Sequence, residues 1–184
     1  MFKALSKATA IGASLAAVTF GLAGCTTTAS PPSAKAPQNL VLEDYFQGKT
    51  TAWGVFQDRN GTLIRQFKVD ITGQWDGSVL TLDEQFDYAD GAKESRVWKI
   101  KKTGPTTYEG RAGDVRGVAQ GLVQGNQLAW VYDVELKIDN RPVVVTFDDR
   151  MWLHSDGVLI NRAKVKKFGI VFGEATIVFQ RPKP

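Results

Sequence analysis

Four charged residues stand where the surrounding sequence is otherwise apolar, and they are the residues best placed to hold a polar group. They are Arg65, Glu84, Arg96 and Asp149. Alternate residues of a strand point to the same face, and each of the four shares its parity with apolar or aromatic neighbours. A buried charge without a partner is too costly to persist, so these groups should pair with each other or with a polar ligand.

Two interpretations of these charges remain open. The first is a set of structural ion pairs that tie the fold together or lie at an open rim. The second is a ligand pocket in which the charges fix a polar head while aromatic side chains hold an apolar body. The aromatic candidates are Phe67, Phe86, Trp98, Trp130 and Phe147. The candidate ligand-binding residues are Arg65, Glu84, Arg96, Trp98, Trp130, Tyr132 and Asp149.

The sequence offers little support for catalytic or metal chemistry. His154 is the only histidine, which excludes a site with several histidine ligands. Asp148 and Asp149 are adjacent in a predicted strand, so they point to opposite faces and form no ready dyad. We therefore predict no catalytic residue, no metal site and no cofactor, and a protein that is not an enzyme. His154 is expected at the surface or at a strand end.

The chain from Thr51 onward shows apolar alternation that is interrupted, every ten or so residues, by Gly, Asn and Asp. Asx-Gly pairs between β-branched and aromatic runs are a strong hairpin signal. The pattern predicts nine or ten antiparallel strands, preceded by a short helical turn or packed lead-in between Leu40 and Phe46. No later window has helical periodicity together with caps.

Sequential hairpins with one buried face favour an all-β, antiparallel up-and-down β-barrel, closed or nearly closed, because closure removes exposed sheet edges. A two-sheet sandwich is the alternative. A transmembrane barrel is disfavoured, since a lipid-facing surface needs an apolar band and several outward positions are polar. These positions are Asp83, Gln85, Asp87, Asp133, Glu135 and Lys137.

A three-residue loop at Ala89–Gly91, with its glycine in the left-handed conformation, fixes the register of one hairpin. It places Glu84 opposite Arg96 and Leu82 opposite Trp98. A carboxylate and a guanidinium would then share an otherwise apolar face.

A two-residue turn at Asn140 and Arg141 is predicted for the later hairpin. It would place Tyr132 opposite Asp149, with Trp130 opposite Met151. The aromatic face of one strand would thus meet the acidic residue of the next.

Residues 1–24 have the features of a secretory signal, with Lys3 and Lys7 before an apolar stretch and small residues at its end. The ending, Leu22-Ala23-Gly24 before Cys25, resembles the bacterial lipoprotein signal, in which the cysteine is lipidated and becomes the mature N-terminus. An ordinary cleaved signal is the alternative. It would leave an exposed lone thiol in an oxidising compartment.

Three segments are predicted: a signal peptide at 1–24, a lipidated flexible tether at 25–39, and a barrel domain at 40–184. Thr26, rather than an aspartate, follows the cysteine. In lipoproteins this implies the outer membrane, with the protein facing the periplasm of a Gram-negative bacterium. More than one acyl chain would anchor the protein stably.

The net charge of +4 falls to about +2 when Lys3 and Lys7 leave with the signal. That charge is too small for a nucleic-acid-binding surface. A single cysteine allows no internal disulfide, so the fold must rely on a hydrophobic core. We predict a one-domain monomer whose partners are the membrane, through the anchor, and a small ligand.

Four short motifs are spread along the chain: Trp53–Arg59, Arg96–Trp98, Phe147–Asp149 and Lys167–Gly169. Together they resemble the DUF3833 family of bacterial lipoproteins, over nearly all of the predicted mature chain. The resemblance implies a lipocalin-like barrel. It implies no activity, because the family is uncharacterised and a fold does not supply a function.

Three functions fit these observations. The favoured one is a non-enzymatic, outer-membrane-anchored barrel that binds a small amphipathic or lipidic ligand. The second is a structural or protein-interaction module of the cell envelope with a filled barrel, and the third is an enzyme acting on an envelope lipid or isoprenoid. A cavity of several hundred cubic ångströms, reached past Arg65 or Arg96, would favour the first over the second.

Overall fold

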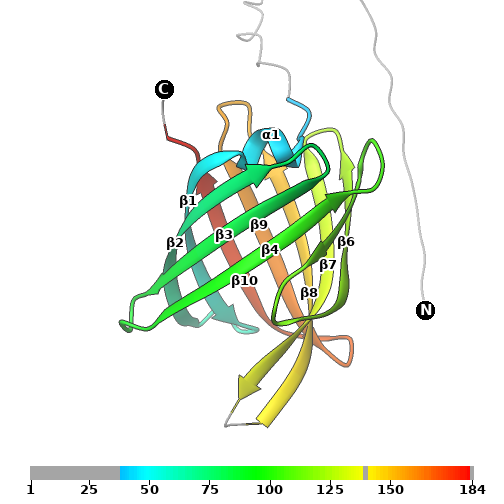
Figure 1. Cartoon of the computed structure of the whole chain (residues 1–184). Helices are drawn as coiled ribbons and strands as arrows, with labels where there is room; N and C mark the ends of the chain where they lie inside the picture. Colours follow the sequence, from blue (N-terminus) through cyan, green and yellow to red (C-terminus); the bar gives the residue numbers. More distant parts are fainter. Residues whose placement is uncertain (1–37, 139–140, 183–184) are drawn as a thin grey trace, which may run out of the picture. The chain divides into compact units, whose positions relative to one another are not determined.

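Ten antiparallel strands in sequential order form a closed barrel in the computed structural model (Figure 1), which describes residues 38–138 and 141–182. This confirms the predicted up-and-down barrel and rules out the sandwich. The strands are β1 (Gly48–Asp58), β2 (Leu63–Trp75), β3 (Val79–Tyr88), β4 (Lys93–Lys102), β5 (Thr107–Arg111), β6 (Val115–Gln124), β7 (Gln127–Ile138), β8 (Arg141–Leu153), β9 (Leu159–Lys167) and β10 (Ile170–Gln180).

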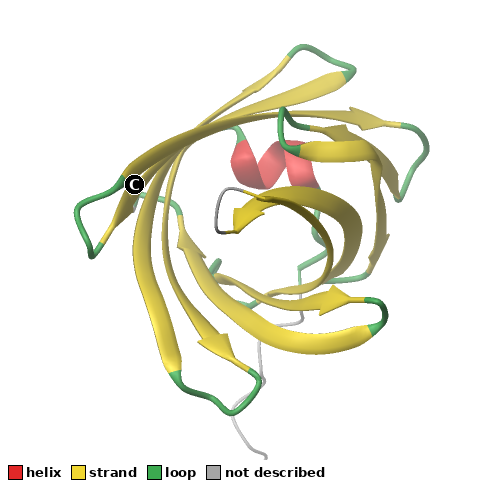
Figure 2. Ribbon diagram, turned by 90° about the horizontal axis from the view of Figure 1, so that it is seen from below, coloured by secondary structure: helices red, strands yellow, loops and turns green. Residues whose placement is uncertain are grey.

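The barrel closes where β1 pairs with β10, from Thr51 opposite Gln180 to Asp58 opposite Gly173. Seen along the barrel axis, the strands form a closed ring (Figure 2). Inward positions alternate with outward ones along each strand, as the sequence pattern predicts. Within the described ranges, no helix is long and apolar enough to cross a membrane.

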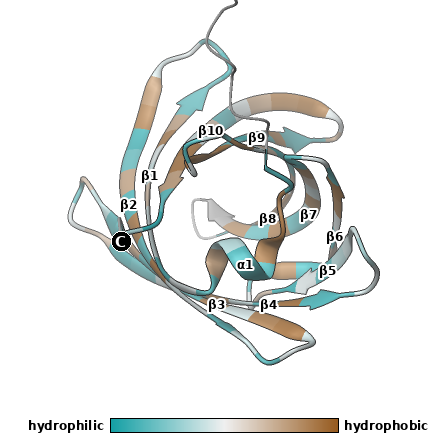
Figure 3. Cartoon of the chain, turned by 90° about the horizontal axis from the view of Figure 1, so that it is seen from above, coloured by the Kyte–Doolittle hydropathy of each residue, from teal (hydrophilic) through white to brown (hydrophobic). Residues whose placement is uncertain are grey.

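One short helix, α1 (Leu42–Phe46), lies across one end of the barrel (Figure 3). Leu42 and Phe46 are buried in the core, and the Tyr45 hydroxyl lies 3.0 Å from the carbonyl oxygen of Phe179, to which it donates. Glu43 accepts hydrogen bonds from Lys102 and from the Tyr108 hydroxyl, at 2.5 and 2.9 Å. The predicted helical turn is confirmed, and it covers part of this end of the barrel.

The first predicted register is confirmed. Glu84 pairs with Arg96 and Leu82 pairs with Trp98 across β3 and β4. Gly91 has a φ of 85°, in the left-handed region that the three-residue loop requires.

The second predicted register is wrong by two residues. Ile138 pairs with Arg141, so Trp130 lies opposite Asp149 and Tyr132 opposite Phe147. Residues 139–140 lie outside the described residues, and Arg141 is the first residue of β8 and not a turn residue. Asp and Asn tolerate turn conformations better than Arg does, which favours reversal one position earlier. A shift of two preserves parity, so each side chain keeps its predicted face.

The predicted signal peptide, Cys25 and nearly all of the predicted tether lie outside the described residues. Leu40 is buried, and its backbone N–H donates to the carbonyl of Gly125.

Two inward-facing glycines make room for Trp130, a large buried side chain of the core. A Cβ atom on Gly110 would lie 2.5 Å from the indole ring of Trp130, and one on Gly121 would overlap the same ring. Because a packed interior cannot absorb such an overlap, the indole position depends on both glycines.

We expect Gly121→Ala to destabilise the barrel by about 1–3 kcal/mol, because the new methyl group overpacks against Trp130. Gly113→Ala is the matched control, since nothing lies within 4 Å of its Cβ position. Chemical denaturation of both variants measures the difference, and equal stabilities would contradict this account of the packing.

Candidate functional site

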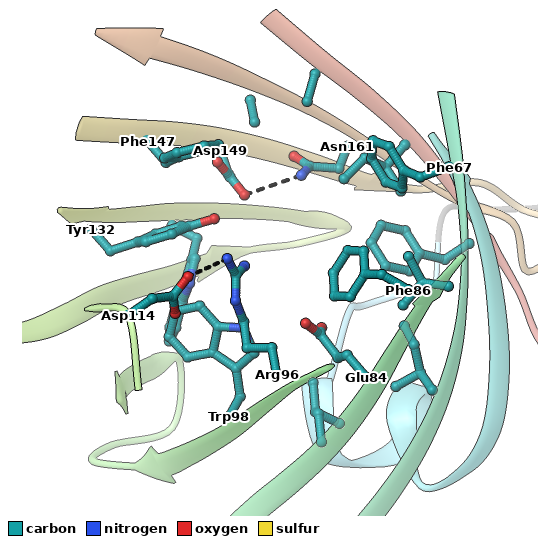
Figure 4. Close-up of a pocket in the computed structure, with 18 of the residues that line it drawn as sticks. Phe67, Glu84, Phe86, Arg96, Trp98, Asp114, Tyr132, Phe147, Asp149 and Asn161 are labelled. Carbon is teal, nitrogen blue, oxygen red and sulfur yellow. Dashed lines mark hydrogen bonds and ion pairs between the residues drawn. The ribbon is translucent and has the colours of Figure 1, made fainter. Parts of the chain in front are cut away.

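A cavity of about 610 Å³ occupies the barrel interior (Figure 4). Its base is apolar, with Leu42 and Phe46 of α1 beside Leu82 and Ile100 of the wall. At the opposite end the lining reaches Ile64, which is exposed at the rim. The cavity therefore has α1 at one end and extends to the rim at the other.

A ring of polar side chains surrounds the middle of the cavity. Arg96 forms an ion pair with Asp114, from the turn between β5 and β6, rather than with its cross-strand neighbour Glu84. Asp149 accepts a hydrogen bond of 3.1 Å from the Asn161 amide nitrogen. Figure 4 shows the six side chains converging on the cavity. They are Glu84, Arg96, Asp114, Tyr132, Asp149 and Asn161.

Several acceptors of this ring lack partners among the described residues. The Asp149 and Asn161 side chains are 4% and 1% exposed, yet Oδ1 of each accepts no hydrogen bond. One carboxylate oxygen of Asp114 is also unpaired. Glu84 makes no side-chain hydrogen bond within the described part of the chain. Buried polar atoms normally have hydrogen-bond partners, so these oxygen atoms lack the donors that a folded interior usually supplies.

Burial sets the protonation of Glu84 and Asp149, the two carboxyl groups of the ring that form no ion pair within the described residues. It raises the pKa of Glu84 to about 7, against the opposing effect of the Arg96 cation. It raises the pKa of Asp149 to about 7 as well, although the hydrogen bond from Asn161 acts in the opposite direction. Burial also raises the pKa of Tyr132, and the charge of Asp149 adds to this, so the phenol stays neutral.

Aromatic rings build one wall beside the polar ring. Trp98 meets Trp130 edge to face at a centroid distance of 5.7 Å, and Tyr132 stacks on Phe147 at 5.3 Å. Such walls supply apolar contact area around a few oriented polar groups, which is the usual composition of a small-molecule site.

Arg65 lies apart from the polar ring, at the rim of the cavity. Its guanidinium pairs with Asp90 at 3.0 Å and with Glu94 at 3.9 Å, and lies 3.4 Å from the centroid of the Tyr88 ring. Arg65 therefore forms structural ion pairs, whereas no ion pair to Glu84 or Asp149 is formed within the described residues. All seven predicted residues line the cavity, and their role in binding stays a prediction.

Sequence reasoning missed two members of the ring. Asn161 alternates with Leu159, Ala163 and Val165 on β9, so its parity already marked it as inward-facing. Asp114 carried no such signal, because it lies in a turn that the alternation does not reach.

The residues predicted to be uninvolved lie outside the cavity. Asp148 points outward and binds Lys166 at 2.6 Å, so it is separated from Asp149 as predicted. His154 follows the last residue of β8, is exposed, and lies 2.8 Å from Asp156. The described residues contain no group of three His, Cys, Asp or Glu that could hold a metal ion.

We expect Asp149→Asn to stabilise the protein at pH 8 by roughly 1–3 kcal/mol, with little effect near pH 4. The folded state keeps the Asp149 proton up to about pH 7, whereas the unfolded chain releases it near the ordinary value of 3.8. Stability is therefore lost as pH rises through this window, and the neutral amide removes that loss. Denaturant unfolding at both pH values measures the difference.

Asp148→Asn is the matched control, with the opposite sign. The hydrogen bond from Lys166 lowers the pKa of Asp148, so its carboxylate stabilises the folded state at neutral pH. A stability difference between Asp149→Asn and the unmodified chain that does not change with pH would contradict the burial of a protonated Asp149.

The fold matches a known structure. The S-type phycobiliprotein lyase CPES from Guillardia theta aligns with a TM-score of 0.58 and 12% sequence identity, over 84% of this chain and 99% of the lyase chain. Identity at this level shows a shared fold alone, and it confirms the lipocalin-like barrel. A search of curated proteins gave no match.

The family comparison covers most of the chain. The model described as "Protein of unknown function (DUF3833)" matches residues 19–181, which include every strand of the barrel. This confirms the resemblance carried by the sequence motifs. The chain belongs to the DUF3833 family.

Proposed function

We propose that this protein is a lipid-anchored envelope protein whose barrel binds a small amphipathic ligand. The observation that carries the proposal is the cavity of about 610 Å³, which combines an apolar base with a ring of polar side chains, several of whose atoms have no hydrogen-bond partner among the described residues. Its volume lies within the range of roughly 300–1,000 Å³ that is typical of small-molecule sites.

The two halves of the cavity suit the two halves of such a ligand. Phe46, Leu82 and Ile100 would contact an apolar chain inserted toward α1, and Glu84 and Asp149 would meet its polar head. A barrel built only as a structural module would fill this space with side chains. The cavity therefore favours binding over the filled-barrel alternative.

The anchor is proposed on the sequence alone. Cys25 directly after Leu22-Ala23-Gly24 and an apolar stretch supports lipidation, and Thr26 supports the outer membrane facing the periplasm. The fold match to a lyase carries no activity to this chain. We propose a non-enzymatic, monomeric binding protein.

Native mass spectrometry of the protein purified from its own membranes tests the binding proposal. We expect an added mass in the low hundreds of daltons, in keeping with a cavity of a few hundred cubic ångströms. An apoprotein recovered cleanly under several purification conditions would count against a resident ligand.

Ala163→Phe should abolish this co-purification by filling the cavity. Ala163 is a buried cavity-lining residue of β9, between Asp149 and Ala175 in the sheet. The matched control is Lys164→Phe, which adds the same ring at the adjacent, exposed position. We expect the control to keep the ligand and both variants to keep the barrel circular dichroism spectrum. Ligand retained at the unmodified level in Ala163→Phe would argue against binding inside the barrel.

Cys25→Ser should leave the protein without acyl chains and release it from the membrane pellet, because serine offers no thiol for lipid attachment. Intact mass and membrane fractionation check this result. Unchanged acylation would show that Cys25 is not the anchor.

A further inference from the structure

The cavity has an imbalance of charge that the proposed function leaves open. Around its middle, one cation, Arg96, faces the three carboxyl groups of Glu84, Asp114 and Asp149 among the described lining residues. Asp114 already pairs with Arg96. At the rim, Arg65 is likewise matched by both Asp90 and Glu94.

The cavity lining also contains hydrogen-bond acceptors for which the described side chains supply no donor. Unpaired acceptors are Oδ1 of Asp114, Asp149 and Asn161, together with the Glu84 carboxylate, which has no hydrogen bond from the described side chains. The Asp149 and Asn161 atoms belong to side chains that are more than nine-tenths buried and that face the cavity in Figure 4. An anionic head would add further acceptors, and a head rich in donors would satisfy those present.

The topology distributes these acceptors round the ligand position. Glu84 lies on β3, whereas Asp149 and Asn161 lie on β8 and β9. In the ring of ten strands, β3 and β8 are five steps apart in either direction, so they form opposite walls. A head group at this depth would have acceptors on two sides and the aromatic wall of Trp98 and Tyr132 between them.

We infer that the ligand carries a cationic head with N–H donors, such as an alkylammonium group, which Glu84 and the Asp149–Asn161 pair receive. The inference rests on the proposed ligand-binding function and narrows its chemistry. A cationic head beside Glu84 and Asp149 would lower their raised pKa values and favour their ionised, accepting forms. A fatty-acid carboxylate or a phosphate head would instead add negative charge beside three carboxyl groups, with a single, already paired guanidinium to offset it.

A matched series of eight-carbon amphiphiles tests the head group. Octylammonium, octanol and octanoate share one chain length and differ in charge. Each amphiphile is titrated into the purified full-length protein in the same neutral detergent. Its affinity is obtained from the rise in melting temperature with amphiphile concentration. We expect octylammonium to bind at least tenfold more tightly than octanoate, with octanol between them.

Variants assign the effect to the cavity. Glu84→Gln and Asp149→Asn should each weaken octylammonium binding about tenfold and change octanol binding by less than threefold. Asp83→Asn and Asp148→Asn are the controls, because each removes a carboxylate next in sequence whose side chain points outward. We expect both controls to bind like the unmodified protein.

The outcomes separate the two proposals. Equal or tighter binding of octanoate would overturn the cationic head and leave the ligand-binding function standing. Loss of octylammonium binding in the outward variants, but not in Glu84→Gln or Asp149→Asn, would also overturn it. If none of the three amphiphiles raises the melting temperature, the proposed binding function itself fails.

Discussion

Hydrogen bonding between β1 and β10 is the constraint on which the rest of this molecule depends. That pairing closes the sheet into a barrel, so none of the ten strands is an edge strand, and neighbouring strands supply most of the backbone hydrogen bonds. A closed ten-strand wall encloses more space than side chains of ordinary size need to fill. The inward positions can then serve a cavity as well as a core.

The interior is divided along the barrel axis by the size and polarity of its side chains. Near α1, Leu42 and Phe46 complete an apolar core, and the buried Tyr45 hydroxyl ties the helix to β10. Farther along, glycines replace larger residues where the Trp130 indole needs room. Beyond this level the lining becomes polar, and several of its atoms have no hydrogen-bond partner in the part of the chain that the structure describes. Such groups lower stability unless something else satisfies them, which is why they point to a bound molecule.

Much of the site could be predicted because alternation within a strand assigns the face of each side chain, and because the one error of register was an even number of residues. Glu84 and Asp149 were placed on inward faces from alternation alone, and the hairpin that was misjudged slipped by two residues, which leaves every face unchanged. Partners were less predictable. Arg96 forms its ion pair with Asp114, a turn residue, and not with its cross-strand neighbour Glu84, because the long arginine side chain reaches past the nearest position. Apolar alternation does not extend into turns, so the sequence does not indicate which way the side chain of a turn residue points.

The sequence by itself determined that nine or ten strands form the fold, the face of the strand side chains that were assigned by alternation, the family and the expectation of a lipid anchor. These depend on local periodicity, turn chemistry and short motifs, all of which act over a few residues. Only the tertiary structure decided that the barrel is hollow, that α1 lies across one end, and which acceptors have no partner among the described residues. Those properties depend on the distances between strands far apart in the chain, and on whether side chains from opposite walls meet or leave space between them.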